Sequence, residues 1–132
     1  DGKLEEAEAL FRELVAGNQQ VLEPEDFQIG RALGGLAKTL ELAGKREEAL
    51  TFSQQALDHR LVHEGPDAWW TNRERLDLAS VLHKLGRLSE AQSLLQELQA
   101  SMSRIDEPED DDRRLLSEAE GLLSIINGVN PE

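Results

Sequence analysis

At 132 residues, 39% of them hydrophobic, the chain is long enough and apolar enough to bury the core of one domain. Its formal net charge of −13 disfavours binding to nucleic-acid phosphates, and its lack of cysteine excludes disulfides, thiolate metal sites and a cysteine nucleophile. No apolar run approaches membrane-spanning length and no signal-peptide pattern opens the chain. We therefore expect a cytoplasmic protein with neither a nucleic-acid nor a membrane partner.

The composition predicts an all-α fold. Aromatic residues make up 4% of the chain and tyrosine is absent, so the core must consist mainly of Leu and Ala, which favour helices. The first expected helix spans residues 3–22, where apolar residues recur at steps of three and four. These residues are Leu4, Ala7, Phe11, Leu14 and Val21.

Further helices follow in chain order, separated by Gly or Pro. After a loop at Pro24, a helix carrying Leu33, Leu36, Ala37 and Leu40 ends at Gly44. The next helix runs from about Lys45 to His63, and the loop 64–67 leads into a helix from about Ala68 to Leu85. Beyond Gly86 a stripe marks another helix, with Leu88, Ala91, Leu95, Leu98, Met102 and Ile105. A last helix is expected over residues 112–127, with Leu115, Ala119, Leu122, Leu123 and Ile126 on one stripe.

The residues at the helix boundaries repeat with a period of 42. Gly2, Gly44, Gly86 and Gly128 share this spacing, as do the prolines at 24, 66 and 108, the glutamates at 6, 48 and 90, and the alanines at 7, 49 and 91. Each Gly is expected to end a helix in the left-handed backbone conformation. The acids after each Pro, including Asp26, Asp67 and Asp112, are expected at helix N-termini, where the helix dipole favours them.

This pattern resembles the tetratricopeptide repeat. Leu followed by a small residue (Leu36-Ala37 and Leu78-Ala79), then a Gly turn and an acid–Ala pair (Glu48-Ala49 and Glu90-Ala91), match its signature. The 42-residue period is similar to the long variety found in kinesin light chains, although the paired Asn of that variety are replaced by Gly34-Gly35 and Leu76-Asp77. The resemblance implies a right-handed superhelix, or α-solenoid, of antiparallel helix pairs in one domain over residues 1–132. It would open with the second helix of a repeat (3–22), followed by repeats at about 27–63 and 69–105 and a final helix.

The resemblance also implies a concave groove lined by the first helix of each pair, in which a peptide binds. The groove candidates are Arg31, Gly35, Lys38 and Glu41 from one repeat, with Arg73, Asp77, Ser80, His83 and Lys84 from the next. Arg31 and Arg73 are one period apart, and guanidinium groups bind carboxylates well, so an acidic segment or a C-terminal carboxylate is one interpretation. The alternative is that both arginines simply pair with neighbouring acids such as Glu74 or Asp77.

Other residues allow two interpretations each. Trp69 lies one period after Phe27, at the same position of the repeat, and this aromatic position is expected to pack against the preceding loop. Trp70 is either buried or an exposed anchor for a partner. His59 and His63 are spaced for zinc but lack a third ligand, so ordinary surface histidines are favoured. The acidic run 106–112 lacks the Gly that a calcium-binding loop needs for its turn, and we interpret it as a solvated loop that leads into the start of a helix.

Three classes of function follow. The favoured one is a protein–protein interaction scaffold that binds a peptide of a protein partner. The second is a sensor or regulatory module of a larger bacterial signalling or transcription protein. An enzyme is disfavoured, because no catalytic constellation is found, and no cofactor or metal is expected. The terminal helix with Leu4, Phe11 and Leu14 would present an apolar end, which predicts coverage by further repeats or by a second copy in a homodimer.

Overall fold

A computed structural model describes residues 2–21, 23 and 26–128 of the chain, which form six helices and no strand. The helices are α1 (Gly2–Val21), α2 (Phe27–Leu42), α3 (Arg46–His63), α4 (Trp69–Lys84), α5 (Leu88–Ser103) and α6 (Asp110–Ile126). The predicted all-α fold is confirmed. Pro24 and the expected end of the first helix at residue 22 lie outside the described residues.

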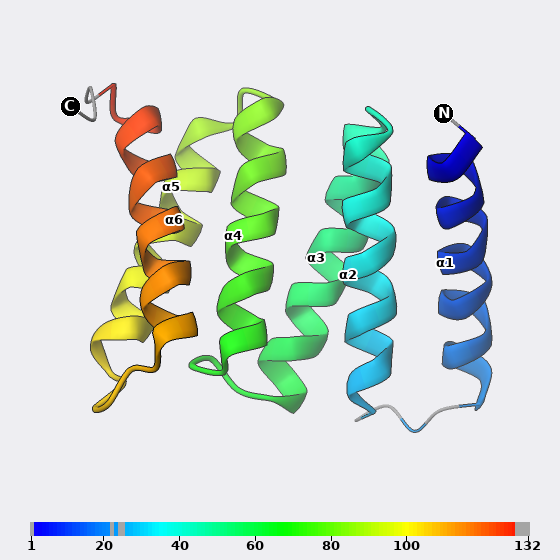
Figure 1. Cartoon of the computed structure of the whole chain (residues 1–132), viewed down its shortest axis with the longest axis horizontal. Helices are drawn as coiled ribbons and strands as arrows, with labels where there is room; N and C mark the ends of the chain where they lie inside the picture. Colours follow the sequence, from blue (N-terminus) through cyan, green and yellow to red (C-terminus); the bar gives the residue numbers. More distant parts are fainter. Residues whose placement is uncertain (1, 22, 24–25, 129–132) are drawn as a thin grey trace. The chain divides into compact units, whose positions relative to one another are not determined.

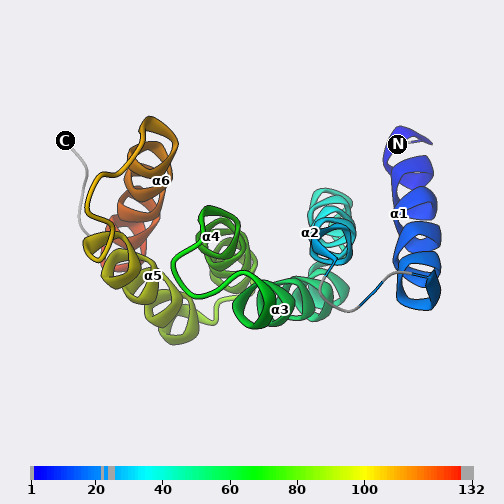
Figure 2. The ribbon, with the colours of Figure 1, turned by 90° about the horizontal axis from the view of Figure 1, so that it is seen from below.

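The chain divides into two compact units, Asp1–Glu64 and Gly65–Glu132. In the first, α2 packs against both α1 and α3, and consecutive helices run antiparallel (Figure 1). In the second, α5 packs against α4 and α6, and α4 also contacts α6 (Figure 2). Each unit is therefore a three-helix assembly in which neighbours in sequence are neighbours in space.

Glycine ends the first helix of each pair as the sequence predicts. Gly44 and Gly86 have φ angles of 82° and 77°, and Gly128 ends α6 with a φ of 73°. After Gly44, the amide of Lys45 donates to the carbonyl of Leu40 at 2.8 Å, and Arg87 repeats this bond to Leu82 after Gly86. These bonds satisfy helix-end carbonyls and turn the chain into the next helix.

One expectation about the turns is wrong. Gly2 is the first residue of α1 rather than the end of a helix, while Gly65 has a φ of 96° and supplies a further left-handed position. Asp67 lies just before α4, as expected, but its carboxylate does not cap the helix; it accepts hydrogen bonds from Ser101 at 2.7 Å and Arg104 at 2.6 Å. The other acids do act at helix starts: Asp26 accepts from the Gln28 amide at 2.9 Å, and Asp112 from the Glu109 amide at 2.9 Å.

The core of each unit consists of Leu and Ala at corresponding positions. Residues 42 apart are buried in both copies, which supports the repeat as the basis of the packing. The pairs are Leu36 and Leu78, Ala37 and Ala79, Leu40 and Leu82, and Ala49 and Ala91. On the expected stripes, Leu14 and Leu88 are exposed, so the buried faces are narrower than the sequence indicated.

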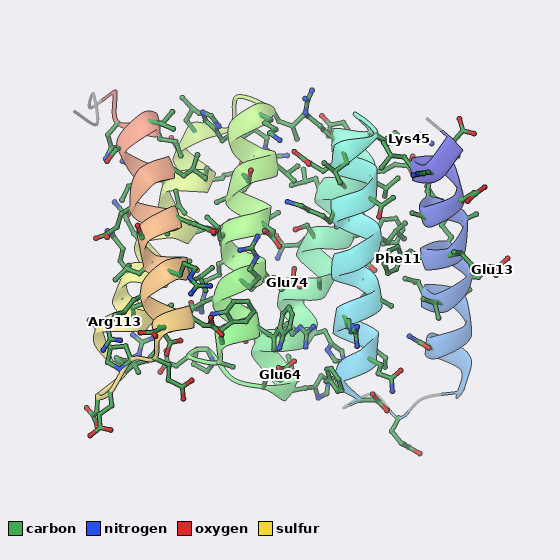
Figure 3. All side chains as sticks on the ribbon, in the orientation of Figure 1. Phe11, Glu13, Lys45, Glu64, Glu74 and Arg113 are labelled. Carbon is green, nitrogen blue, oxygen red and sulfur yellow. The ribbon has the colours of Figure 1, made fainter. Side chains whose placement is uncertain are left out.

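Helix α1 is held against α2 by side-chain packing and by ion pairs. Phe11 of α1 lies against Gly35 of α2 (Figure 3), and at the other end of the interface Glu8 pairs with Lys45 and Arg12, each at 2.9 Å. The hydrogen bonds from Lys45, and then Arg12, lower the pKa of the Glu8 carboxyl. These contacts fix α1 beside α2, which determines what remains accessible on α2.

Candidate protein-interaction surface

One face of α2 carries a row of exposed side chains. At 100° per residue, positions 27, 31, 34, 38 and 42 fall within about 80° of one another around the helix axis. Phe27, Arg31, Lys38 and Leu42 are all exposed there, and Gly34 lies between the two cations. We refer to these five residues as the α2 face.

The burial of the opposite side of α2 fixes the direction of this face. Leu33, Leu36, Ala37 and Leu40 are buried, so the helix cannot rotate without exposing them. The α2 face is therefore presented to solvent by the same packing that stabilises the unit.

The chemistry of the α2 face is basic in the middle and apolar at both ends. Within the described part of the chain, neither Arg31 nor Lys38 has an ion pair. Phe27 is 50% exposed and Leu42 is 60% exposed. Two cations that pair with no described acid, flanked by apolar groups, suit a ligand that is acidic and partly apolar.

A hollow of about 290 Å³ lies beside the Leu42 end of the α2 face. Leu4 of α1 and Leu42 provide its apolar lining, and Glu5, Glu8 and Lys45 its polar lining. A space of this size can accept one side chain of a bound segment. The sequence analysis missed Phe27 and Leu42 as parts of the surface, although Leu42 falls outside the apolar stripe of α2 and could have been recognised by that.

Two groove candidates in α2 do not belong to the exposed face. Glu41 is buried, with 7% of its surface exposed. A Cβ atom on Gly35 would lie 2.4 Å from Cε1 of Phe11, so Gly35 serves the contact with α1. Only Arg31 and Lys38 of the four candidates in this helix are exposed.

The corresponding part of α4 is different. Arg73 pairs with Asp77 and with Glu118 of α6, each at 3.1 Å. The alternative interpretation, pairing with neighbouring acids, thus describes Arg73, whereas Arg31 has no ion pair with any residue that the structure describes. Ser80 and His83 are partly exposed and Lys84 is exposed, yet the arginine at the centre of this set is already neutralised.

The remaining candidates are two histidines on α3 and two tryptophans at the start of α4. The rings of His59 and His63 lie 4.5 Å apart on α3, but no group of three His, Cys, Asp or Glu residues that could hold a metal occurs among the described residues. Trp69 does not simply pack on the preceding loop, because its indole N–H donates to the carbonyl of Asp111 at 3.2 Å. Trp70 is 46% exposed.

The fold and the surface define the class of the protein as an α-helical repeat protein with an accessible helix face. The family model of the tetratricopeptide repeat matches residues 1–61, which include α1, α2 and most of α3. These residues therefore belong to a tetratricopeptide repeat family, whose repeats generally mediate interactions between proteins. No curated protein matches the sequence. In the described residues, no helix combines the length and the apolar character needed to cross a bilayer.

Proposed function

We propose that the protein is an interaction scaffold that binds an extended, acidic segment of a partner protein along the α2 face. Carboxylates of the segment pair with Arg31 and Lys38, and its apolar side chains cover Phe27 and Leu42. The observation that carries this proposal is the pair of exposed cations that have no acidic partner among the described residues. Hydrogen bonds that involve charged groups contribute about 1.5–3 kcal/mol each, enough for measurable binding when two act together.

The geometry accounts for binding to an extended chain rather than to a single carboxylate. Arg31 and Lys38 are seven residues apart, about 10 Å along the helix axis. Three residues of an extended segment in the polyproline II conformation span about 9 Å and bring the side chain back to the same face. Gly34 between the two cations leaves room for the backbone of the segment to approach the helix.

The test is binding of a labelled peptide with two glutamates spaced by three residues and a leucine at each end. Arg31→Glu with Lys38→Glu should weaken binding at least about tenfold, because each ion pair becomes a repulsion. Arg46 is exposed at the start of α3 and lies off the α2 face, so Arg46→Glu supplies a control with the same charge change as Arg31→Glu. Equal loss of affinity in Arg31→Glu and Arg46→Glu would reduce the effect to net charge and refute the proposal.

A second candidate role, self-association, has its own observation. Leu10 and Leu14 of α1, one helical turn apart, are 61% and 50% exposed. We propose that a second copy covers this face. Sedimentation velocity should show a dimer that Leu10→Glu abolishes, and a monomer at high concentration would count against it. The alternative role in a larger bacterial signalling or transcription protein stays a prediction and would use the same α2 face.

A further inference from the structure

The second unit contains a cleft of about 670 Å³ beside the starts of α4 and α6. The only two tryptophans of the chain, Trp69 and Trp70, line it together with carboxylates of the loop before α6 and of the first turn of α6. The carboxylates are those of Glu107, Glu109, Asp111 and Asp112. Asp67 and Ile105 complete the lining.

The aromatic part of the cleft is held in place. Trp69 donates its indole N–H to the carbonyl of Asp111, which ties the start of α4 to the start of α6. The rings of Trp69 and Trp70 meet edge to face, with centroids 4.8 Å apart and an interplanar angle of 87°. Trp70 nevertheless keeps 46% of its surface exposed, so a large aromatic group remains open to a ligand.

The charge of the cleft is negative and only partly balanced. Among the residues whose positions are described, no Lys, Arg or His lines it. Arg104 neutralises Asp67, and Arg114 approaches Asp111 at 3.8 Å with both side chains largely exposed. Within the described residues, neither Glu107 nor Glu109 has an ion pair. The cleft therefore attracts cations.

The arrangement does not suit a metal ion. No three acidic or histidine side chains converge on a common point in the part of the chain that the structure describes. The carboxylates are instead spread around an aromatic surface. Cations with delocalised charge, above all guanidinium, bind the face of Trp and pair with carboxylates through several N–H donors at once.

We propose that this cleft docks a basic, arginine-containing segment of a partner protein. One guanidinium stacks over Trp70, and further cations of the segment pair with Glu107 and Glu109. The volume exceeds the space of a single side chain, and the carboxylates extend from the loop into α6, which favours a segment over a small cation. The inference does not depend on the function proposed for the α2 face, because residues, ligand charge and unit all differ.

The test uses a labelled peptide of alternating arginine and glycine at physiological salt, with affinity measured by anisotropy. Trp70→Leu removes the π face and should weaken binding about fivefold to thirtyfold, whereas Trp70→Phe should retain most of it. Glu107→Gln with Glu109→Gln should weaken binding at least about tenfold. Glu13→Gln with Glu120→Gln changes the net charge equally at exposed positions outside the cleft and should have less than about a twofold effect.

Each outcome bears on the proposal. Equal loss in the two charge variants, or full binding by Trp70→Leu, would show that the polyanionic chain merely attracts polycations and would overturn it. Absence of binding by the unaltered protein would do the same. Tetramethylammonium that competes as strongly as the peptide would show a small-cation pocket instead of a docking cleft. Far-UV circular dichroism checks that the variants fold. If Trp70→Leu does not fold, the comparison of the two charge variants still tests the proposal.

Discussion

The contact between Gly35 and Phe11 gives the sharpest prediction about stability. A methyl group at position 35 would lie 2.4, 2.6 and 3.0 Å from three atoms of the Phe11 ring. Ordinary van der Waals contact begins near 3.4 Å, so the rigid ring, and α1 with it, must move by about 1 Å. Gly35→Ala combines a gain of about 1 kcal/mol in helix propensity with an overpacking cost of about 1–3 kcal/mol. We expect net destabilisation of up to about 2 kcal/mol.

Gly121 provides the matched control. It lies inside α6, is exposed, and a Cβ atom there would meet nothing within 4 Å. Gly121→Ala should therefore stabilise the protein by about 0.5–1 kcal/mol. Urea unfolding followed by far-UV circular dichroism measures both changes.

A double-mutant cycle isolates the cause. When Phe11→Ala removes the ring, Gly35→Ala should change from destabilising to stabilising, with a coupling free energy of about 1–3 kcal/mol. If Gly35→Ala stabilises the unaltered protein as much as Gly121→Ala does, α1 does not pack against α2 as described, and the reasoning fails.

Three further predictions concern the turns, a loop and the core. Gly86→Ala should cost about 1–2 kcal/mol because of the positive φ, and Gly86→Asn should cost less; equal stability of both variants would contradict the left-handed turn. Hydrogen bonds from Arg104, then Ser101, lower the pKa of Asp67 from 3.8 to about 2, so its stabilising effect is complete above about pH 4 and is lost as the pH falls toward 2. Carboxyl NMR titration should give this midpoint, and Arg104→Gln should shift it toward 3.8. Leu36→Ala should cost about 2–5 kcal/mol, while Val62→Ala, at a side chain that is 76% exposed, should change the free energy of unfolding by less than about 0.5 kcal/mol, as measured by urea unfolding.

The periodic features of the fold could be predicted from the sequence because they depend on local rules. Gly44, Gly86 and Gly128 adopt the left-handed conformation that a glycine after an apolar stripe indicates. The Leu and Ala columns are buried in both copies for the same reason. The helices α3 and α6 begin within two residues of the positions predicted.

The differences between the copies could not be predicted, because they arise from packing between helices. Arg31 and Arg73 occupy equivalent positions of the repeat. Arg73 is neutralised by Glu118, a residue 45 positions away, whereas Arg31 has no ion pair among the residues that the structure describes. Trp69 and Phe27 also share a column, but only an indole carries the N–H that binds the carbonyl of Asp111. A column identifies equivalent backbone positions and leaves the surroundings of each side chain undetermined.

The buried polar residues show the same limitation. Arg60 is 1% exposed, at the position where the other copy has Met102. A Cβ atom on Gly30 would lie 2.8 Å from Nε of Arg60, so the absence of a side chain at Gly30 makes room for the guanidinium. The corresponding residue of the other copy, Asn72, is buried and donates to Ser101 at 2.9 Å. A large residue on one helix is thus matched by a small residue on the helix that faces it, and such matches can be recognised only when the facing helices are known.

The central claim is that the α2 face binds an acidic segment, and NMR mapping tests it most directly. The peptide with two glutamates should shift the backbone amide signals of Phe27–Leu42, with the largest changes near Arg31 and Lys38, and Arg31→Glu with Lys38→Glu should remove those changes. Shifts confined to other helices, or no shifts at saturating peptide, would contradict the account.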